Sequence, residues 1–156
     1  MKAEFGAGIA CQQALLDNVT NNWSFIGCLE RVGVLRTPCT LPGFALAVRL
    51  DLEEPAPADT EFEVQFFRED ADGESLIGQP GFTFPAGAHS RWTWMHFRFL
   101  RIKGEGPITF RAKWRKVGAK AWRSGRIATI SVVGVNLNAH ERDDLLAQLD
   151  GLAPLG

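Results

Sequence analysis

The chain has 156 residues, of which 46% are hydrophobic and 22% are charged, and its formal net charge at pH 7 is −1. The length is typical of a single domain, and no apolar run approaches the ~20 residues of a membrane-spanning helix. The balanced charge also argues against a dedicated nucleic-acid-binding domain, because such domains are usually basic as a whole.

The N-terminus and the cysteines predict a cytoplasmic protein. Residues 1–6 show no apolar segment followed by a cleavage site, so we expect no signal peptide. Cys11, Cys28 and Cys39 are odd in number and lack the spacing of a metal site. We therefore expect buried, reduced thiols. Cys11 and Cys28 can lie close together across the first hairpin, but this depends on which residues form the turn, because the turn sets the register of the two strands.

Short segments that alternate with a period of two, with turn residues about every ten positions, predict an all-β fold. We expect an antiparallel two-sheet β-sandwich of about eight strands. The turns include Asp70-Ala71-Asp72-Gly73, which contains the Asp-Gly pair typical of hairpins. In chain order, the predicted strands are 3–16, 23–32, 43–52, 61–68, 75–84, 91–102, 108–117 and 121–134.

The charges are sorted along these segments. Between Asp51 and Glu74 there are ten acids and one base, whereas between Arg91 and Arg126 there are eleven bases and one acid. In the second stretch, the segment 108–117 places apolar side chains on one face and three cations, Arg111, Lys113 and Arg115, on the other. Arg111 and Lys113 can pair with Glu61 and Glu63 inside the fold, or the basic face can attract an anionic ligand or a second copy of the chain.

The last part of the chain predicts one short amphipathic helix. Asn138 is a suitable N-cap, and acidic residues occupy the first turns. We therefore divide the chain into a β-sandwich domain, 1–135, and a C-terminal helix and tail, 136–156. The apolar stripe of this helix is a candidate surface for a partner and comprises Leu145, Leu146, Leu149 and Leu152.

One stretch resembles the opening of an uncharacterised bacterial family of small β-sandwich proteins. It runs Asp17-Asn18-Val19-Thr20-Asn21-Asn22-Trp23-Ser24-Phe25-Ile26-Gly27-Cys28-Leu29-Glu30-Arg31-Val32. Members of that family begin with a strand, an Asp…Thr-Asn-Asn-x-Ser turn and a second strand ending in Leu-Glu-x-Ile/Val. The segments 106–110 and 127–135 fit the last two places of the family pattern. The resemblance covers most of residues 9–135 and implies a small soluble sandwich, with no activity to transfer.

No catalytic set can be assembled from the sequence. The three histidines, His89, His96 and His140, do not lie in a recognised nucleophile motif. The acidic turn at 70–74 resembles part of a calcium loop but lacks the rest of the twelve-residue pattern, so a hairpin turn explains it better. We expect a protein that is not an enzyme and that holds no metal or other cofactor.

The segment 91–102 is the sharper candidate for binding. Trp92, Trp94, His96 and Arg98 share one face, and the other face carries Met95, Phe97 and Phe99. If the second face belongs to the core, the tryptophans form an outward strip that can stack sugars or unpaired bases. The alternative, which we favour, is that both faces are covered, by the opposite sheet and by the C-terminal helix or a partner subunit.

These observations lead to two functional hypotheses. The first is a non-catalytic, soluble assembly or binding module that self-associates or binds a protein partner and does not bind membranes. Its candidate surfaces are the basic segment with Arg111, Lys113 and Arg115, the Trp-bearing face and the leucine stripe. The second is a module that stacks carbohydrate or single-stranded nucleic acid on Trp92 and Trp94 next to a basic strand.

Overall fold

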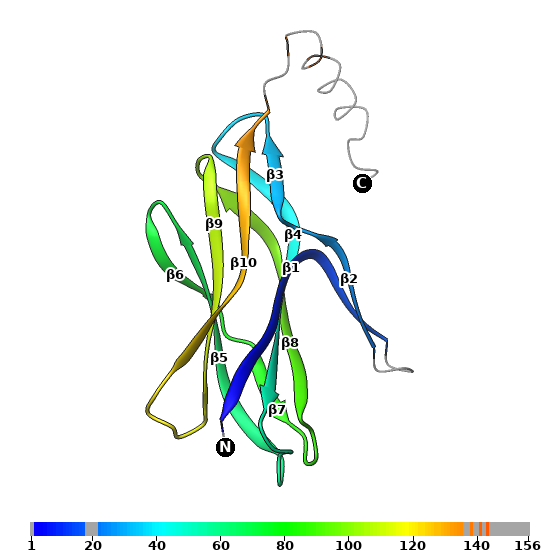
Figure 1. Ribbon diagram of the computed structural model, residues 1–156. Helices are drawn as coiled ribbons and strands as arrows, with labels where there is room; N and C mark the ends of the chain where they lie inside the picture. The colour runs from blue at the N-terminus through cyan, green and yellow to red at the C-terminus, as the bar shows by residue number, and fades with distance from the viewer. Residues whose placement is uncertain (1, 18–21, 136–137, 139–140, 142, 144–156) are drawn as a thin grey trace.

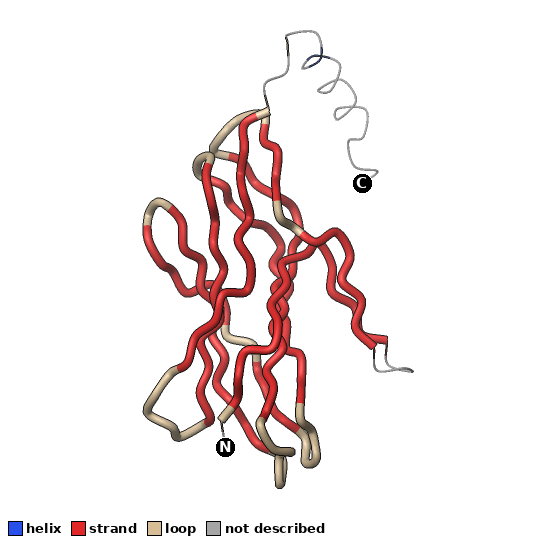
Figure 2. Tube along the Cα trace, viewed as in Figure 1, coloured by secondary structure: helices blue, strands red, loops and turns tan. Residues whose placement is uncertain are grey.

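The computed structural model describes residues 2–17, 22–135, 138, 141 and 143 (Figures 1 and 2). Most of these residues lie in β-strands, so the predicted all-β class is confirmed. The strands are β1 (Ala3–Asp17), β2 (Asn22–Cys28), β3 (Arg31–Val34), β4 (Cys39–Leu52), β5 (Thr60–Asp70), β6 (Gly73–Gly78), β7 (Gly81–Phe84), β8 (Ser90–Ile102), β9 (Gly106–Lys116) and β10 (Arg123–Gly134).

The strands form two sheets. Sheet A has the order β2-β1-β4-β8, and sheet B has the order β3-β10-β9-β5-β6, with β7 pairing with β5 beyond the end of β6. The pairings are antiparallel except for β3 with β10, which is parallel. The sequence predicted only antiparallel pairs, because β2 and β3 were expected to be one strand of one sheet.

Two predicted strands are each divided in the structure. The segment 23–32 becomes β2 and β3, because the chain leaves sheet A near Glu30 and joins β10 of sheet B. There the Ser131 N–H donates to the Glu30 carbonyl at 2.8 Å. The segment 75–84 becomes β6 and β7, which Gln79 and Pro80 separate, and proline has no N–H to give to a strand ladder.

The core between the sheets follows the predicted alternation. On β9, the inward side chains Ile108, Phe110, Ala112 and Trp114 are all buried. On β5, the same holds for the predicted inward residues Phe62, Val64 and Phe66. Burying each large apolar side chain contributes roughly 1.5–3 kcal/mol, so these alternating rows are a main source of stability.

Strand β1 connects the two sheets. Up to Cys11 it pairs with β4, and its other side lies against β10. The strands approach so closely there that a Cβ atom on Gly8 would lie 2.5 Å from the Cα atom of Ile127. Glycine is therefore required at this position, and the first half of β1 is fixed between β4 and β10.

The predicted C-terminal helix falls largely outside the described residues. The Glu141 N–H donates to Asn138 Oδ1 at 2.9 Å, and the Asn138 N–H donates to Glu141 Oε2 at 3.0 Å. This reciprocal pair is the hydrogen-bond pattern of a capping box. The leucine stripe, Leu145, Leu146, Leu149 and Leu152, lies outside the described residues. Within the part of the chain that the structure describes, no helix is long and apolar enough to cross a membrane.

Candidate functional site

The structure shows which face of β8 belongs to the core. Thr93 is buried, and the ring of Phe97 stacks on that of Phe44 with centroids 4.7 Å apart. Trp92 and Trp94 therefore point to the outer face of sheet A. The alternation changes after Phe97, so Phe99, predicted to lie on the core face, is 63% exposed.

Beyond Cys11, β1 pairs with no described strand other than β2. We call this two-stranded extension, residues 12–17 and 22–28, the β1–β2 arm; Figure 1 shows it projecting from the body of the sandwich. At its base, Gly27 has a φ of +63°, a conformation that favours glycine. This glycine allows the ribbon to turn so that Trp23 and Phe25 face β8.

Four rings from the arm and β8 form an aromatic cluster, which comprises Trp23, Phe25, Trp92 and Trp94. Trp23 meets Trp94 edge-on with centroids 4.4 Å apart, and Phe25 lies 4.9 Å from Trp92. Two outward residues of β4 beneath them, Ala45 and Ala47, are small and have no exposed surface, whereas Arg49 lies opposite Trp92. Each aromatic pair contributes ~0.5–1.5 kcal/mol beyond its buried area, so the cluster holds the arm against sheet A.

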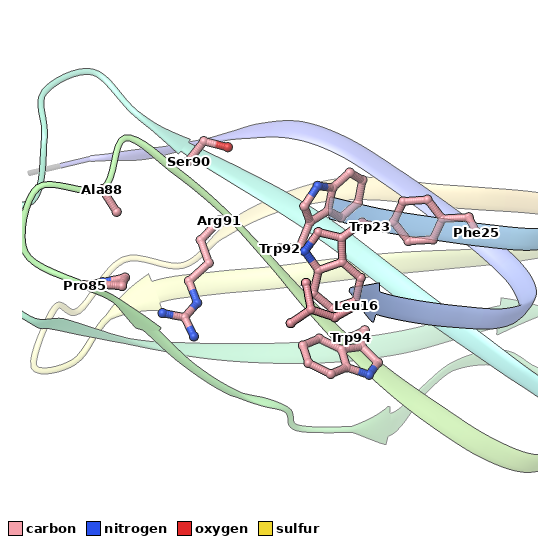
Figure 3. Close-up of a pocket in the computed structure, with 9 residues that line it drawn as sticks. All are labelled: Leu16, Trp23, Phe25, Pro85, Ala88, Ser90, Arg91, Trp92 and Trp94. Atoms are coloured by element: carbon pink, nitrogen blue, oxygen red, sulfur yellow. The ribbon is translucent and has the colours of Figure 1, made fainter. Parts of the chain in front are cut away.

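A groove of about 680 Å³ lies beside this cluster. Leu16 and the four rings line one side, and Pro85, Ala88, Ser90 and Arg91 line the other. In the view of Figure 3, the Arg91 guanidinium lies between Pro85 and the aromatic rings. Trp94 is still 39% exposed, so part of its ring is accessible to a ligand in the groove.

The cations of β8 are not neutralised within the described part of the chain. Arg91, Arg98 and Arg101 are exposed and form no ion pair among those residues, and the side chain of His96 is exposed as well. No acidic residue occurs anywhere in β8. The Trp-bearing strand is therefore a locally positive surface on a protein whose overall charge is close to zero.

The predicted basic row on β9, comprising Arg111, Lys113 and Arg115, lies on the outer face of sheet B, away from Trp92 and Trp94 of sheet A. Each of its cations meets a carboxylate of β5 or β6. The three contacts are Arg111 Nε to Glu69 Oε2 at 2.9 Å, Lys113 Nζ to Glu74 Oε1 at 2.6 Å and Arg115 Nη2 to Glu63 Oε2 at 2.6 Å.

Aromatic rings also contact this basic row. Lys113 Nζ lies 4.0 Å from the Phe67 ring centroid, and the Arg115 guanidinium lies 4.4 Å from that of Trp122. The acidic and basic stretches of the sequence are thus neighbours in sheet B, and much of their charge is compensated there. The two halves of the predicted binding surface do not come together.

The acidic turn between β5 and β6 binds cations of the protein itself. Asp70 pairs with Arg68 at 2.7 Å, and Asp72 pairs with Lys103. The Asp72 N–H donates to Asp70 Oδ1 at 3.0 Å, which is the local hydrogen bond of an Asx turn. The hydrogen bond from Lys103 lowers the pKa of Asp72. Among the described residues, no group of three metal-type ligands is found.

Cys11 and Cys28 are directly opposite each other on β1 and β2, and both are free thiols. Cys11 is buried and Cys28 is exposed. Burial raises the pKa of the Cys11 thiol, and the neighbouring Cys28 raises it further by a smaller amount. Cys11 is therefore the less reactive of the two thiols.

Sequence reasoning identified Trp92 and Trp94 but missed the residues that complete the groove. Trp23 and Phe25 alternate with polar Ser24, a pattern that places both rings on one face of a strand. This alternation predicts that the rings of Trp23 and Phe25 share a face. It does not predict that this face contacts β8, because that contact depends on how far sheet A curls.

Comparisons with known proteins give no family assignment. No family model matches the chain, and no curated protein matches it. Among solved structures, it is similar to the alkylpurine DNA glycosylase AlkC of Pseudomonas fluorescens bound to DNA with an abasic site analogue, at 14% identity and a TM-score of 0.42. It is also similar to a β-glucosidase of Erythrobacter marinus, at 12% identity and a TM-score of 0.46.

The matches cover 66% and 85% of this chain but only 27% and 15% of those two proteins. With TM-scores below 0.5, neither likeness bears on function.

Proposed function

We propose that this chain is a non-catalytic binding module whose site is the groove between the β1–β2 arm and β8. The observation that carries the proposal is the combination, in one groove, of four aromatic rings and Arg91, a cation without an ion-pair partner among the described residues. Aromatic side chains beside cations are the usual elements of sites that stack flat rings carrying negative charge.

Of the two ligand classes considered from the sequence, this chemistry favours single-stranded nucleic acid over neutral carbohydrate. Its bases supply the flat rings and its phosphates supply the charge. Trp92 and Trp94 are separated by about 6.6 Å along an extended strand. Arg91 precedes them and lines the groove, and Arg98 lies further along β8, outside the groove lining. The chain as a whole is not basic, so we expect a short binding site with modest affinity.

A reducing, cytoplasmic setting is part of this proposal, and the free thiols at Cys11 and Cys28 support it. Membership of the uncharacterised bacterial sandwich family stays a prediction. The neutralised row on β9 does not support charge-driven head-to-tail assembly, because its cations already have partners.

The test is a titration of the full chain with a labelled oligonucleotide of about twelve nucleotides, followed by anisotropy and by tryptophan emission. Trp94→Ala should weaken binding by about 5- to 150-fold, which corresponds to ~1–3 kcal/mol for one stacked base. Phe99→Ala is the matched control, because it removes an exposed ring of the same strand outside the groove, and should change binding by less than about twofold.

A neutral oligosaccharide of six sugars serves as the competing probe. Binding of that sugar without binding of the oligonucleotide would replace the nucleic-acid proposal with the carbohydrate one. No binding of either probe, or equal losses in Trp94→Ala and Phe99→Ala, would contradict the groove as a binding site.

A further inference from the structure

Sheet A has two edge strands, β2 and β8, and their chemistry differs. β8 carries Arg91, Arg98 and Arg101 and no acid. If two copies paired antiparallel through β8, Arg91 of one copy would lie near Arg101 of the other. Like charges facing each other across strands are destabilising, and charged side chains are a common protection of exposed edges. β8 is therefore protected against pairing with itself.

β2 lacks every such protection. Its seven residues include no charged residue and no proline, and among the described strands it pairs with β1 alone. Because the arm projects from the body, no described strand lies along the free side of β2 (Figure 1). An uncharged edge strand of this kind presents a row of backbone N–H and C=O groups that another strand can pair with.

The arm also has an exposed apolar face. Leu15 lies opposite Ser24, and Gln13 lies opposite Ile26, so these four side chains share the face that points away from the aromatic cluster. Leu15 is 42% exposed and Ile26 is 49% exposed. Together with the open edge, this face gives the arm an apolar surface that intrachain contacts of the described residues leave uncovered.

We propose that β2 pairs antiparallel with β2 of a second copy of this chain. Pairing about a two-fold axis at Phe25 joins two four-stranded sheets into one continuous sheet of eight strands. A second copy is the partner that fits, because the strand is self-complementary and brings no like charges together. In this register, Ser24 of one copy lies opposite Ile26 of the other, and the exposed apolar side chains of both arms gather on one face.

The inference is independent of the proposed function, since it uses the edge and outer face of the arm and not the groove. One strand pair of seven residues is a small interface, and small interfaces belong to weak complexes. We expect a dissociation constant on the order of micromolar. Because the interface is uncharged, the dimer should not dissociate as salt rises, whereas a dimer held by surface ion pairs would.

The test is sedimentation or light scattering of the full chain over a range of concentrations up to the order of 1 mM. The wild-type protein should reach twice its mass of 17.2 kDa, at low and at high salt. The variant Ser24→Lys with Ile26→Lys places two introduced lysines opposite each other and should remain monomeric. The variant Ser24→Glu with Ile26→Lys places opposite charges together and should dimerise again, now with a dependence on salt.

Dimerisation of the last variant would also show that substitution at these two positions leaves the arm folded. A monomeric wild-type chain at the highest concentration would overturn the proposal. So would a dimer of the double-lysine variant, or a monomer of the mixed-charge variant with the wild-type circular dichroism spectrum. Loss of oligonucleotide binding in Trp94→Ala has no bearing on these masses, so the groove and the edge can fail separately.

Discussion

Replacing the carboxylates that face the basic row on β9 should lower the free energy of unfolding at low salt. The difference from the wild type should largely disappear at high salt. The variant is Glu63→Gln with Glu69→Gln and Glu74→Gln, and the three carboxylates lie 2.6–2.9 Å from their cations. The six side chains are between 29% and 47% exposed, so each pair contributes only ~0.2–1 kcal/mol. We therefore expect a loss of about 0.6–3 kcal/mol at low salt, with the contacts to Phe67 and Trp122 left intact.

The assay is urea unfolding at low salt and at about 1 M salt, where the Debye length falls to about 3 Å and the difference should largely vanish. The matched control is Glu53→Gln with Glu54→Gln and Glu61→Gln, which changes the net charge equally. These three acids form no ion pair within the described residues, so the control should stay within about 0.5 kcal/mol of the wild type. Equal losses in both variants, or a loss that persists at high salt, would refute the assignment of the charges to internal pairing.

Three further predictions concern single residues. Trp23→Ala should destabilise the protein by about 2 kcal/mol in urea unfolding. This is roughly half the cost at a fully buried site, because the Trp23 ring is half-buried in the aromatic cluster. An unchanged urea midpoint would contradict the packing of the arm. Because the pKa of Asp72 is lowered in the folded state, its stabilising contribution is present above the normal aspartate pKa and is lost as the pH falls through the folded value. Lys103→Gln should raise that pKa in an NMR titration, and no change would contradict the pairing. At pH 8, the exposed Cys28 should react with a thiol reagent far faster than the buried Cys11. Mass spectrometry of the labelled protein measures the two rates. Equal rates would mean that the base of the arm opens.

The parts of the fold that were predictable are those in which one face of a strand is apolar and the other polar. The segment with Ile108 and Arg111 alternates cleanly, and so does the segment with Phe62 and Glu63, and both have the predicted faces in the core. The Asp-Gly pair before Glu74 likewise marks the turn between β5 and β6, where Gly73 has a φ of +106°.

The candidate site was less predictable, because both faces of β8 carry large side chains. Alternation alone could not show that Thr93 faces inward while Trp92 faces outward. The cover over the tryptophans comes from Trp23 and Phe25, about 70 residues earlier in the chain, whereas the sequence suggested the C-terminal helix or a partner.

The partners of the charged residues also depend on register. Glu61 and Glu63 were predicted to pair with Arg111 and Lys113. In the structure Glu63 lies opposite Arg115, while Arg111 meets Glu69 and Lys113 meets Glu74. A shift of two residues along a strand keeps the same face and changes every partner, so the pattern of charges predicts pairing in general and not the individual pairs.

The binding surface should be formed by the cations of β8, which have no ion-pair partner among the described residues, and not by the paired cations of β9. The most direct test compares the oligonucleotide affinity of Arg91→Gln with Arg98→Gln against that of Arg111→Gln with Arg115→Gln, since each variant loses two positive charges. The β8 variant should bind about tenfold or more weakly, with a salt slope lower by roughly 1.4, whereas the β9 variant should stay close to the wild type. Equal losses in the two variants, or a larger loss in the β9 variant, would contradict it.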